Sequence, residues 1–245
     1  MKLSPQEKAA QKAAFRAMPP AKKLEHIYLY YKWPILLALI ALVILGSTLH
    51  RELTAKKPVL YVAAANVTLG EDLQDALLNG YLLDAGYNTA REEVYWYPDL
   101  YLSDGADVMN HEYAYASRIK TMAAIQAQKM DLVLMNRESY DLISQNGYLL
   151  PLPDVLDGAD PALLDVLDGH RVSNTVILED NGIEYQLGEA ESHQVVSEEA
   201  ENAIVLTDFS LFADAGFPEP IYLGILANTP RLPECLSYLA YLCGA

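Results

Sequence analysis

The chain has 245 residues, of which 52% are hydrophobic and 20% charged, so it can bury a sizeable core and wholesale disorder is excluded. Its two cysteines exclude a small disulfide-stabilised scaffold. A net charge of −16 argues against nucleic acid as the main partner.

The charge is divided unevenly along the chain. Residues 1–57 contain ten Lys and Arg against three acidic residues, a net charge of +7, whereas the remainder carries −23. Such opposite charges indicate two parts that occupy different surroundings or have different roles.

A long apolar segment lies at the boundary between these parts. The stretch from Trp33 to Leu49 carries no charge, and tyrosines and a tryptophan cluster just before and at its start. About twenty apolar residues cross a bilayer core as a helix, and aromatic residues favour its interface. We therefore expect a transmembrane helix over residues 27–49 that contacts the lipid bilayer. A buried core helix fits the basic flanks poorly. A cleaved signal peptide fits poorly too, because the preceding segment is long and no small-residue cleavage site follows.

The basic residues predict the orientation of this helix. Seven Lys and Arg precede the uncharged run and three follow it, which favours a cytoplasmic N-terminus. The expected order is a cytoplasmic basic tail at 1–26, the membrane helix at 27–49, a polar linker at 50–57 and an extracytoplasmic domain at 58–245. Within the tail, Ser4–Met18 reads either as a helix on anionic headgroups or as a solvated segment.

Strand and helix patterns alternate from Pro58 onward. The continuous apolar run Val59–Ala65 is typical of a strand covered on both faces. In the second helix, Ile119, Met122 and Ala123 are expected to point inward. The alternation predicts an α/β fold with a mostly parallel sheet. The expected strands are Val59–Ala65, Glu93–Tyr97, Asp131–Met135 and Tyr148–Leu152, and the helices are Glu71–Ala85, Tyr115–Ala127 and Ser139–Gln145.

The later part of the chain departs from this alternation. Thr175–Leu187 reads as a β-hairpin with Asn181-Gly182 at its turn. Ala203–Leu206 and Ile221–Ala227 are expected strands. A closing helix with leucines at 232, 236, 239 and 242 is expected to pack beside the first strands.

The pattern resembles the type II periplasmic, or extracellular, solute-binding proteins. Three segments carry the resemblance: the strand–helix–strand of residues 58–97, Asp131–Leu152 with its Asn146-Gly-Tyr-Leu-Leu-Pro-Leu end, and Tyr222–Leu242. The chain also resembles small single-pass membrane proteins of Gram-positive bacteria. The resemblance implies a reduced two-lobed domain, with lobe 1 formed by 58–152 and 221–245 and lobe 2 by 153–220, and a ligand cleft between the lobes.

Candidate ligand-binding residues follow from this arrangement, because open α/β sheets bind ligands at the carboxyl ends of their strands. A sugar, a peptide or an anion is the expected ligand class, and Arg137 would suit a carboxylate or phosphate. The tyrosines have the alternative interpretation of simple packing, and Arg137 that of an exposed residue at a helix start. The candidates are Asn66, Thr68, Tyr97, Asp99, Tyr101, Tyr113, Asn136, Arg137, Asp208 and Ser210.

Motifs for catalysis, metal binding and cofactor binding are not found, so we expect a protein that is not an enzyme and needs neither a metal nor a cofactor. Cys235 and Cys243 should be free, since eight residues of helix place their Cα atoms about 12 Å apart, beyond the ~7 Å limit of a disulfide. Two functional hypotheses stay open. One is a membrane-anchored module that captures or senses a small ligand. The other is a structural or regulatory envelope protein that binds proteins, including a membrane protein partner.

Overall fold

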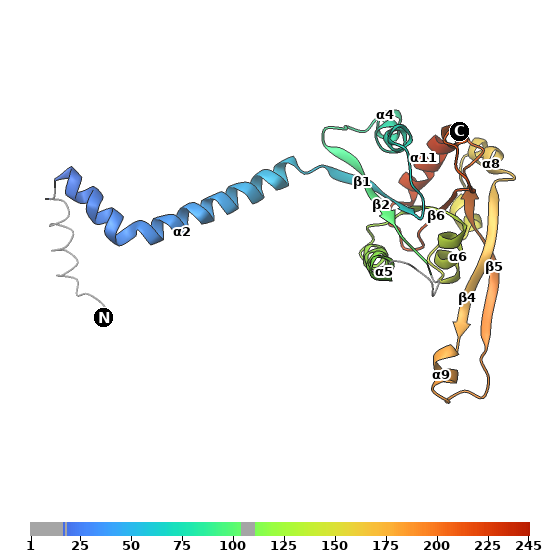
Figure 1. The fold of residues 1–245 in the computed structure, drawn as a ribbon. Coiled ribbons are helices and arrows are strands. Elements are labelled where there is room, and N and C mark those ends of the chain that lie inside the picture. Colours follow the sequence, from blue (N-terminus) through green and yellow to red (C-terminus); the bar gives the residue numbers. More distant parts are fainter. Residues whose placement is uncertain (1–16, 18, 104–110) are drawn as a thin grey trace. The chain divides into compact units, whose positions relative to one another are not determined.

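The structure is a computed structural model that describes residue 17, residues 19–103 and residues 111–245 (Figure 1). The chain separates into two units, Met1–Ala55 and Lys56–Ala245. Residues 1–16 and 18, which hold most of the expected surface helix at Ser4–Met18, lie outside the described residues.

The first unit contains one long helix, α2, from Pro20 to Thr54. Its segment Lys32–Glu52 spans 21 residues with a mean hydropathy of 2.0, and none of it is buried. This helix is therefore long and apolar enough to cross a membrane. The residues expected to form a polar linker at 50–57 continue α2 as far as Thr54, and the first strand begins at Lys57. The hydroxyl of Thr54 donates to the carbonyl of His50 at 2.7 Å, as a side chain within a continuing helix does.

The second unit is an α/β fold built on one six-stranded sheet in the order β2-β1-β3-β6-β5-β4. Strands β2, β1 and β3 are parallel, whereas β6, β5 and β4 are added antiparallel. The strands are β1 (Lys57–Ala65), β2 (Glu92–Leu100), β3 (Leu132–Met135), β4 (Arg171–Asp180), β5 (Val195–Val205) and β6 (Tyr222–Ile225).

Helices cover both faces of this sheet and make three layers (Figure 1). One face carries α3 (Glu71–Asp75), the π-helical segment η1 (Ala76–Gly80), α4 (Tyr81–Asp84), α7 (Leu152–Leu156), α8 (Pro161–Leu167), α10 (Ser210–Ala213) and α11 (Leu232–Cys243). The other face carries α5 (His111–Gln126) and α6 (Arg137–Gln145). Strand β1 is buried on both faces: Leu60 and Val62 join one core, Ala63 and Ala65 the other. This confirms the strand expected from its continuous apolar run.

The two-lobed arrangement is not confirmed. Residues 153–220 contribute β4 and β5, and both belong to the same sheet as the parallel strands. In the described part of the chain, residues 56–245 group as one unit rather than two lobes. The lobe boundaries that the resemblance implies therefore do not divide the sheet, because strands from both expected lobes belong to it.

The hairpin expected at Thr175–Leu187 is wrong. Strand β4 continues to Asp180, and Asn181-Gly182 begins a short helix, α9 (Gly182–Gln186), instead of a two-residue turn. Asn181 has φ −92°, whereas a type I′ turn needs a positive φ there. The partner of β4 is β5, which starts only at Val195.

Helix α11 packs as expected against the face of β1. Cys235, Tyr238, Leu239 and Leu242 are all fully buried in the core that also holds Leu60 and Val62. Cys235 and Cys243 are free, as expected. Burial raises the pKa of both thiols to about 12.

A buried carboxylate joins β3 to the segment before α11. Asp131, which is 0% exposed, accepts hydrogen bonds from the Tyr61 backbone N–H at 2.8 Å, the Thr229 hydroxyl at 2.5 Å and the Arg231 Nε at 2.8 Å. The Arg231 guanidinium lies 4.6 Å from the centre of the Tyr61 ring and donates to the Gln128 carbonyl. The groups of this cluster come from β1, from the loop before β3 and from the segment before α11, so the cluster fixes how these three segments pack.

Candidate functional site

The carboxyl ends of β1 and β2 are held together by Asn66. Its side chain donates to the Leu102 carbonyl at 2.6 Å and accepts from the Leu102 N–H at 2.8 Å, while its own N–H donates to the Leu100 carbonyl. Asn66 has φ 55°, a left-handed conformation that asparagine tolerates better than most residues. The candidate ligand contact is therefore occupied by the chain's own backbone.

The end of β3 is closed in the same way. The Asn136 side chain caps α6 by accepting from the Ser139 N–H at 3.0 Å, and the Ser139 hydroxyl donates to the Ala65 carbonyl at 2.9 Å. Glu138 accepts from the Ser103 hydroxyl at 2.5 Å. These bonds join β1, β3 and the segment after β2, and they use the polar groups that a ligand would need.

The tyrosines of the expected cleft pack on one another and on neighbouring residues. Tyr101 and Tyr113 stack with ring centres 6.4 Å apart, and the Tyr113 hydroxyl donates to the Asp99 carbonyl at 2.5 Å. Tyr97 packs against the core, and its pKa is raised by burial and by the nearby Tyr95. The structure thus brings Tyr101, Tyr113 and Asp99 together.

Arg137 lies apart from this tyrosine group. It pairs with Asp141 one turn later at 2.9 Å, and its guanidinium lies 5.5 Å from the ring of Tyr140 and 5.9 Å from that of Tyr222. Its side chain is 53% exposed. Thr68, Asp208 and Ser210 are also exposed, and within the described residues their side chains make no hydrogen bond to the other candidates.

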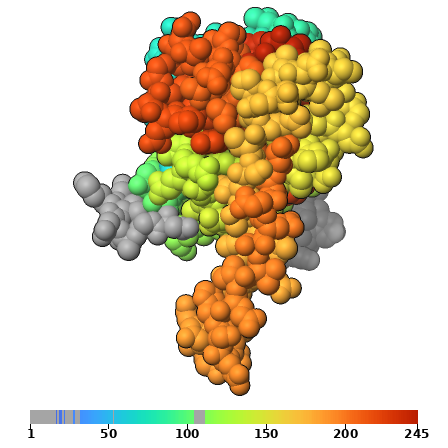
Figure 2. All heavy atoms as spheres, turned by 90° about the vertical axis from the view of Figure 1, so that its right-hand side faces the viewer, coloured from blue at the N-terminus to red at the C-terminus, as the bar shows by residue number. Residues whose placement is uncertain are grey.

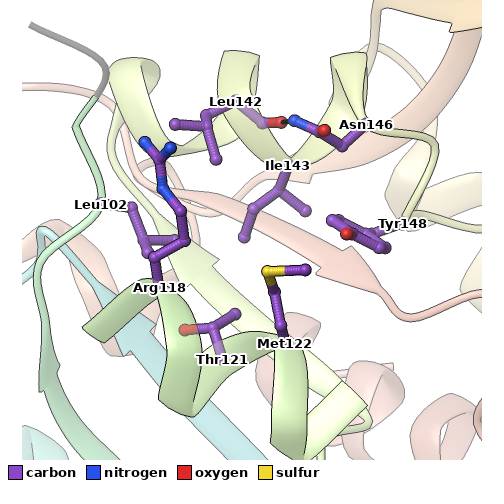
Figure 3. Close-up of a pocket in the computed structure, with 8 residues that line it drawn as sticks. All are labelled: Leu102, Arg118, Thr121, Met122, Leu142, Ile143, Asn146 and Tyr148. Carbon is purple, nitrogen blue, oxygen red and sulfur yellow. Dashed lines mark hydrogen bonds between the residues drawn. The ribbon is translucent and has the colours of Figure 1, made fainter. Parts of the chain in front are cut away.

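A cavity of about 300 Å³ lies elsewhere, between α5 and α6 (Figure 3). Thr121 and Met122 approach it from α5, Ile143 and Asn146 from α6, and the Arg118 side chain extends along one edge. None of the ten candidate residues lines this cavity. Its lining residues are Leu102, Arg118, Thr121, Met122, Leu142, Ile143, Asn146 and Tyr148.

The expected inward face of α5 is mostly wrong: Ile119, Met122 and Ala123 are all exposed, and of these three only Met122 lines the cavity. Ile119 is 50% exposed and Met122 38% exposed, whereas Ser117, Thr121, Ala124 and Ile125 are buried. The Thr121 hydroxyl donates to the Ser117 carbonyl at 2.9 Å, so these small polar residues are satisfied within their own helix. Three of these four buried residues have small side chains, so no apolar periodicity in the sequence indicates which face of α5 is buried.

A second unassigned feature is the pair β4–β5 with α9, residues 171–205, which we call the arm. Only Ile204 and Val205 of the arm pair with β6, so most of its length extends beyond the rest of the sheet (Figure 1). Figure 2 shows its end standing clear of the body of the unit. The large apolar side chains there are 48–72% exposed, namely Leu178, Ile183, Tyr185, Leu187, Val195 and Val196.

The base of the arm is fixed to α6 by a polar network. The Tyr140 hydroxyl donates to Asn202 Oδ1 at 2.8 Å, and Asn202 Nδ2 donates to Ser144 Oγ at 2.8 Å. Ser144 Oγ donates in turn to the Thr175 carbonyl at 3.2 Å, and Asn174 Nδ2 donates to Asp141 Oδ1 at 2.8 Å. Because Asn202 and Ser144 are buried and fully partnered, the network sets the direction in which the arm leaves the sheet.

No protein-family model matches the chain, and neither the curated proteins nor the solved structures contain a match to it. These comparisons identify no solute-binding-protein-like domain, so that resemblance stays a prediction.

Proposed function

We propose that this chain is a single-pass protein of the cell membrane, without enzymatic activity, whose extracytoplasmic α/β unit binds other proteins through the arm. The observation that carries the proposal is the arm itself. It places six large apolar side chains in solvent at the end of a rigidly based strand pair. Exposed apolar clusters on soluble units are typical of interaction sites.

The membrane anchor is supported by α2. A mostly apolar helical segment of 21 residues, none of it buried, needs an apolar environment from elsewhere, and the lipid bilayer supplies one. The basic excess before the apolar run supports a cytoplasmic N-terminus.

A small-ligand function is the second candidate. The carboxyl edge of the sheet supports it poorly, because Asn66, Asn136 and Ser139 are already bonded within the chain. The cavity between α5 and α6 supports it better, since about 300 Å³ could hold a small sugar, peptide or anion beside Arg118.

The proposed topology predicts opposite accessibility for the two ends of the chain. Variants Ser192→Cys, at the end of the arm, and Ser4→Cys, in the basic tail, are labelled in intact cells with a membrane-impermeant maleimide. We expect modification of Ser192→Cys alone, and of both variants once the cells are permeabilised. The reverse pattern in intact cells would contradict the orientation.

Protein binding by the arm is tested by photo-crosslinking in the native membrane. A photoreactive amino acid replaces Ile183 on the arm or, as the matched control, Leu83 on α4, which is 68% exposed and lies outside the arm. We expect Ile183 to form discrete protein adducts and Leu83 to form none of them. If neither position forms an adduct, or both form the same ones, binding through the arm is wrong.

A further inference from the structure

The end of the arm is a preformed element rather than a loose loop. The Asn181 side chain donates to the Ser192 carbonyl at 3.0 Å and accepts from the Gln194 N–H at 2.6 Å, which closes the loop around α9. Asp180 accepts from the Gly182 N–H and from His193, each at 2.8 Å. The Tyr185 ring stacks on His193 with centres 6.0 Å apart. The loop that carries the apolar side chains is therefore fixed before binding and loses little backbone freedom on binding, which favours affinity.

The charges around these apolar side chains share one sign. The arm contains eight Asp and Glu and only one Lys or Arg, a net charge of −7. That cation, Arg171, lies at the base and pairs with Glu201 at 3.4 Å. Towards the end of the arm, Glu184, Glu189 and Glu191 are exposed. Within the described residues, these three carboxylates form no salt bridge, so they are available to an incoming cation.

This charge decides between the possible occupants of the apolar surface. A second copy would bring its own arm of −7 and a unit whose residues 56–245 carry nine basic against thirty acidic residues, a charge of −21. Anionic lipid headgroups would repel the arm for the same reason. A protein surface that surrounds apolar side chains with Lys or Arg would satisfy both the apolar and the acidic groups.

We propose, resting on the protein-binding function above, that the end of the arm docks a cationic, apolar segment of a partner protein. The apolar side chains of α9, Ile183 and Leu187 first among them, would be buried in the contact. The carboxylates at 184, 189 and 191 would pair with basic side chains at its rim. The contact should therefore weaken as salt concentration rises.

The test measures binding of fluorescent helical peptides to the full chain in detergent. One peptide combines leucine and lysine, the second replaces its lysines by glutamate, and the third replaces its leucines by serine. We expect the first to bind and the other two to bind at least about tenfold more weakly, because each lacks one of the two complementary features. Equal binding of the glutamate peptide would overturn the cationic assignment, and equal binding of the serine peptide would overturn the apolar one.

Variants of the chain locate the contact. Ile183→Ser/Leu187→Ser should weaken the leucine–lysine peptide about tenfold or more, whereas Leu83→Ser, at an equally exposed site outside the arm, should leave it unchanged. Glu184→Gln/Glu189→Gln/Glu191→Gln should weaken it about tenfold. The matched triple Asp154→Asn/Asp157→Asn/Asp165→Asn, which removes three exposed carboxylates from α7, α8 and the link between them, should not. Equal effects of the two triples would mean that only the overall charge attracts the peptide, and the proposal would be overturned.

Two further measurements exclude the other occupants. We expect the full chain to show no self-association that the Ile183→Ser/Leu187→Ser variant abolishes, and we expect its arm not to bind anionic or zwitterionic vesicles. Self-association through the arm would identify a second copy as the occupant, and vesicle binding would identify a lipid surface. Either finding would overturn the cationic partner. The proposal is also separable from the function on which it rests. Adducts from Ile183 without binding of the leucine–lysine peptide would keep protein binding and overturn the partner's chemistry. Absence of adducts would overturn protein binding itself.

Discussion

A chain that ends at Arg231, and so lacks α11, should lose the cooperative thermal unfolding of the α/β unit. Four side chains of α11 are fully buried: Cys235, Tyr238, Leu239 and Leu242. Burial of each large apolar side chain contributes about 1.5–3 kcal/mol, and a domain's net stability is only about 5–15 kcal/mol. The ring of Tyr238 also meets that of Tyr81 edge-on at 4.8 Å, so the loss reaches into the helix that follows β1.

Circular dichroism during heating measures the loss of cooperative unfolding. Point variants show how much a single buried side chain of α11 contributes to the free energy of unfolding. Leu239→Ala should lower the free energy of unfolding by about 2–5 kcal/mol, because it leaves a cavity between α11 and the sheet. Leu83→Ala, at an exposed position, should change it by less than about 0.5 kcal/mol. A truncated chain that kept the native spectrum and melting transition would show that α11 is dispensable for the core.

The second large effect is expected from Arg231→Met. This substitution removes the cation from Asp131, which is 0% exposed in the native chain, and leaves it only the Tyr61 N–H and the Thr229 hydroxyl as donors. Removing one partner of a buried ion pair costs about 3–5 kcal/mol, because the other charge is left uncompensated. The methionine keeps much of the packing on Tyr61, so the loss reports mainly on the charge.

Arg137→Met is the matched control for this prediction. Arg137 pairs with Asp141 at 2.9 Å, close to the 2.8 Å between Arg231 and Asp131, but the side chains of Arg137 and Asp141 are 53% and 36% exposed. Exposed pairs contribute about 0–1 kcal/mol. Urea unfolding of the two variants should therefore differ by several kcal/mol. Equal costs would mean that Arg231 acts only through packing.

Burial explains which elements could be predicted from the sequence. Strand β1 and helix α11 both pack in the core, so their buried positions must be apolar. In β1 this requirement gives a continuous apolar run, and in α11 it gives leucines at helical spacing. The strand Ala203–Leu206 was found for the same reason, because Ala203 and Ile204 are buried. The antiparallel half of the sheet was not predicted, because pairing direction depends on how distant segments meet.

The arm could not be predicted from the sequence, because most of it is exposed and burial imposes no apolar pattern on it. Most of β5 lies in solvent, so Glu198 and Glu199 occur within a strand without any alternation of buried and exposed positions. With its partner strand unrecognised, the Asn181-Gly182 pair predicted a tight turn where α9 begins. A strand that lies in solvent and is supported mainly by its neighbour, as β5 is over Val195–Glu199, has no pattern of buried apolar residues in its sequence.

The candidate site shows a similar division. The position of Asn66 and Asn136 at the carboxyl ends of parallel strands was predicted correctly from the order of elements. Their hydrogen bonds to Leu102 and Ser139 were not, because they depend on loop geometry. The cavity beside Met122 depends on the rotation of α5, which small buried residues rather than large ones determine.

The reactivity of the cysteine thiols on α11 can be used to measure local opening of the native chain. Only a thiolate attacks disulfide reagents or maleimides, and burial keeps Cys235 and Cys243 protonated at neutral pH by raising the pKa of each to about 12. Cys235 is also 0% exposed, so its mixed-disulfide formation has to wait until α11 leaves the sheet, and its rate in dilute denaturant measures how often this helix detaches. A cysteine introduced at position 192 would react at once, and the two phases would separate on one time course. In oxidising surroundings the same shielding would keep Cys235 from linking neighbouring copies covalently.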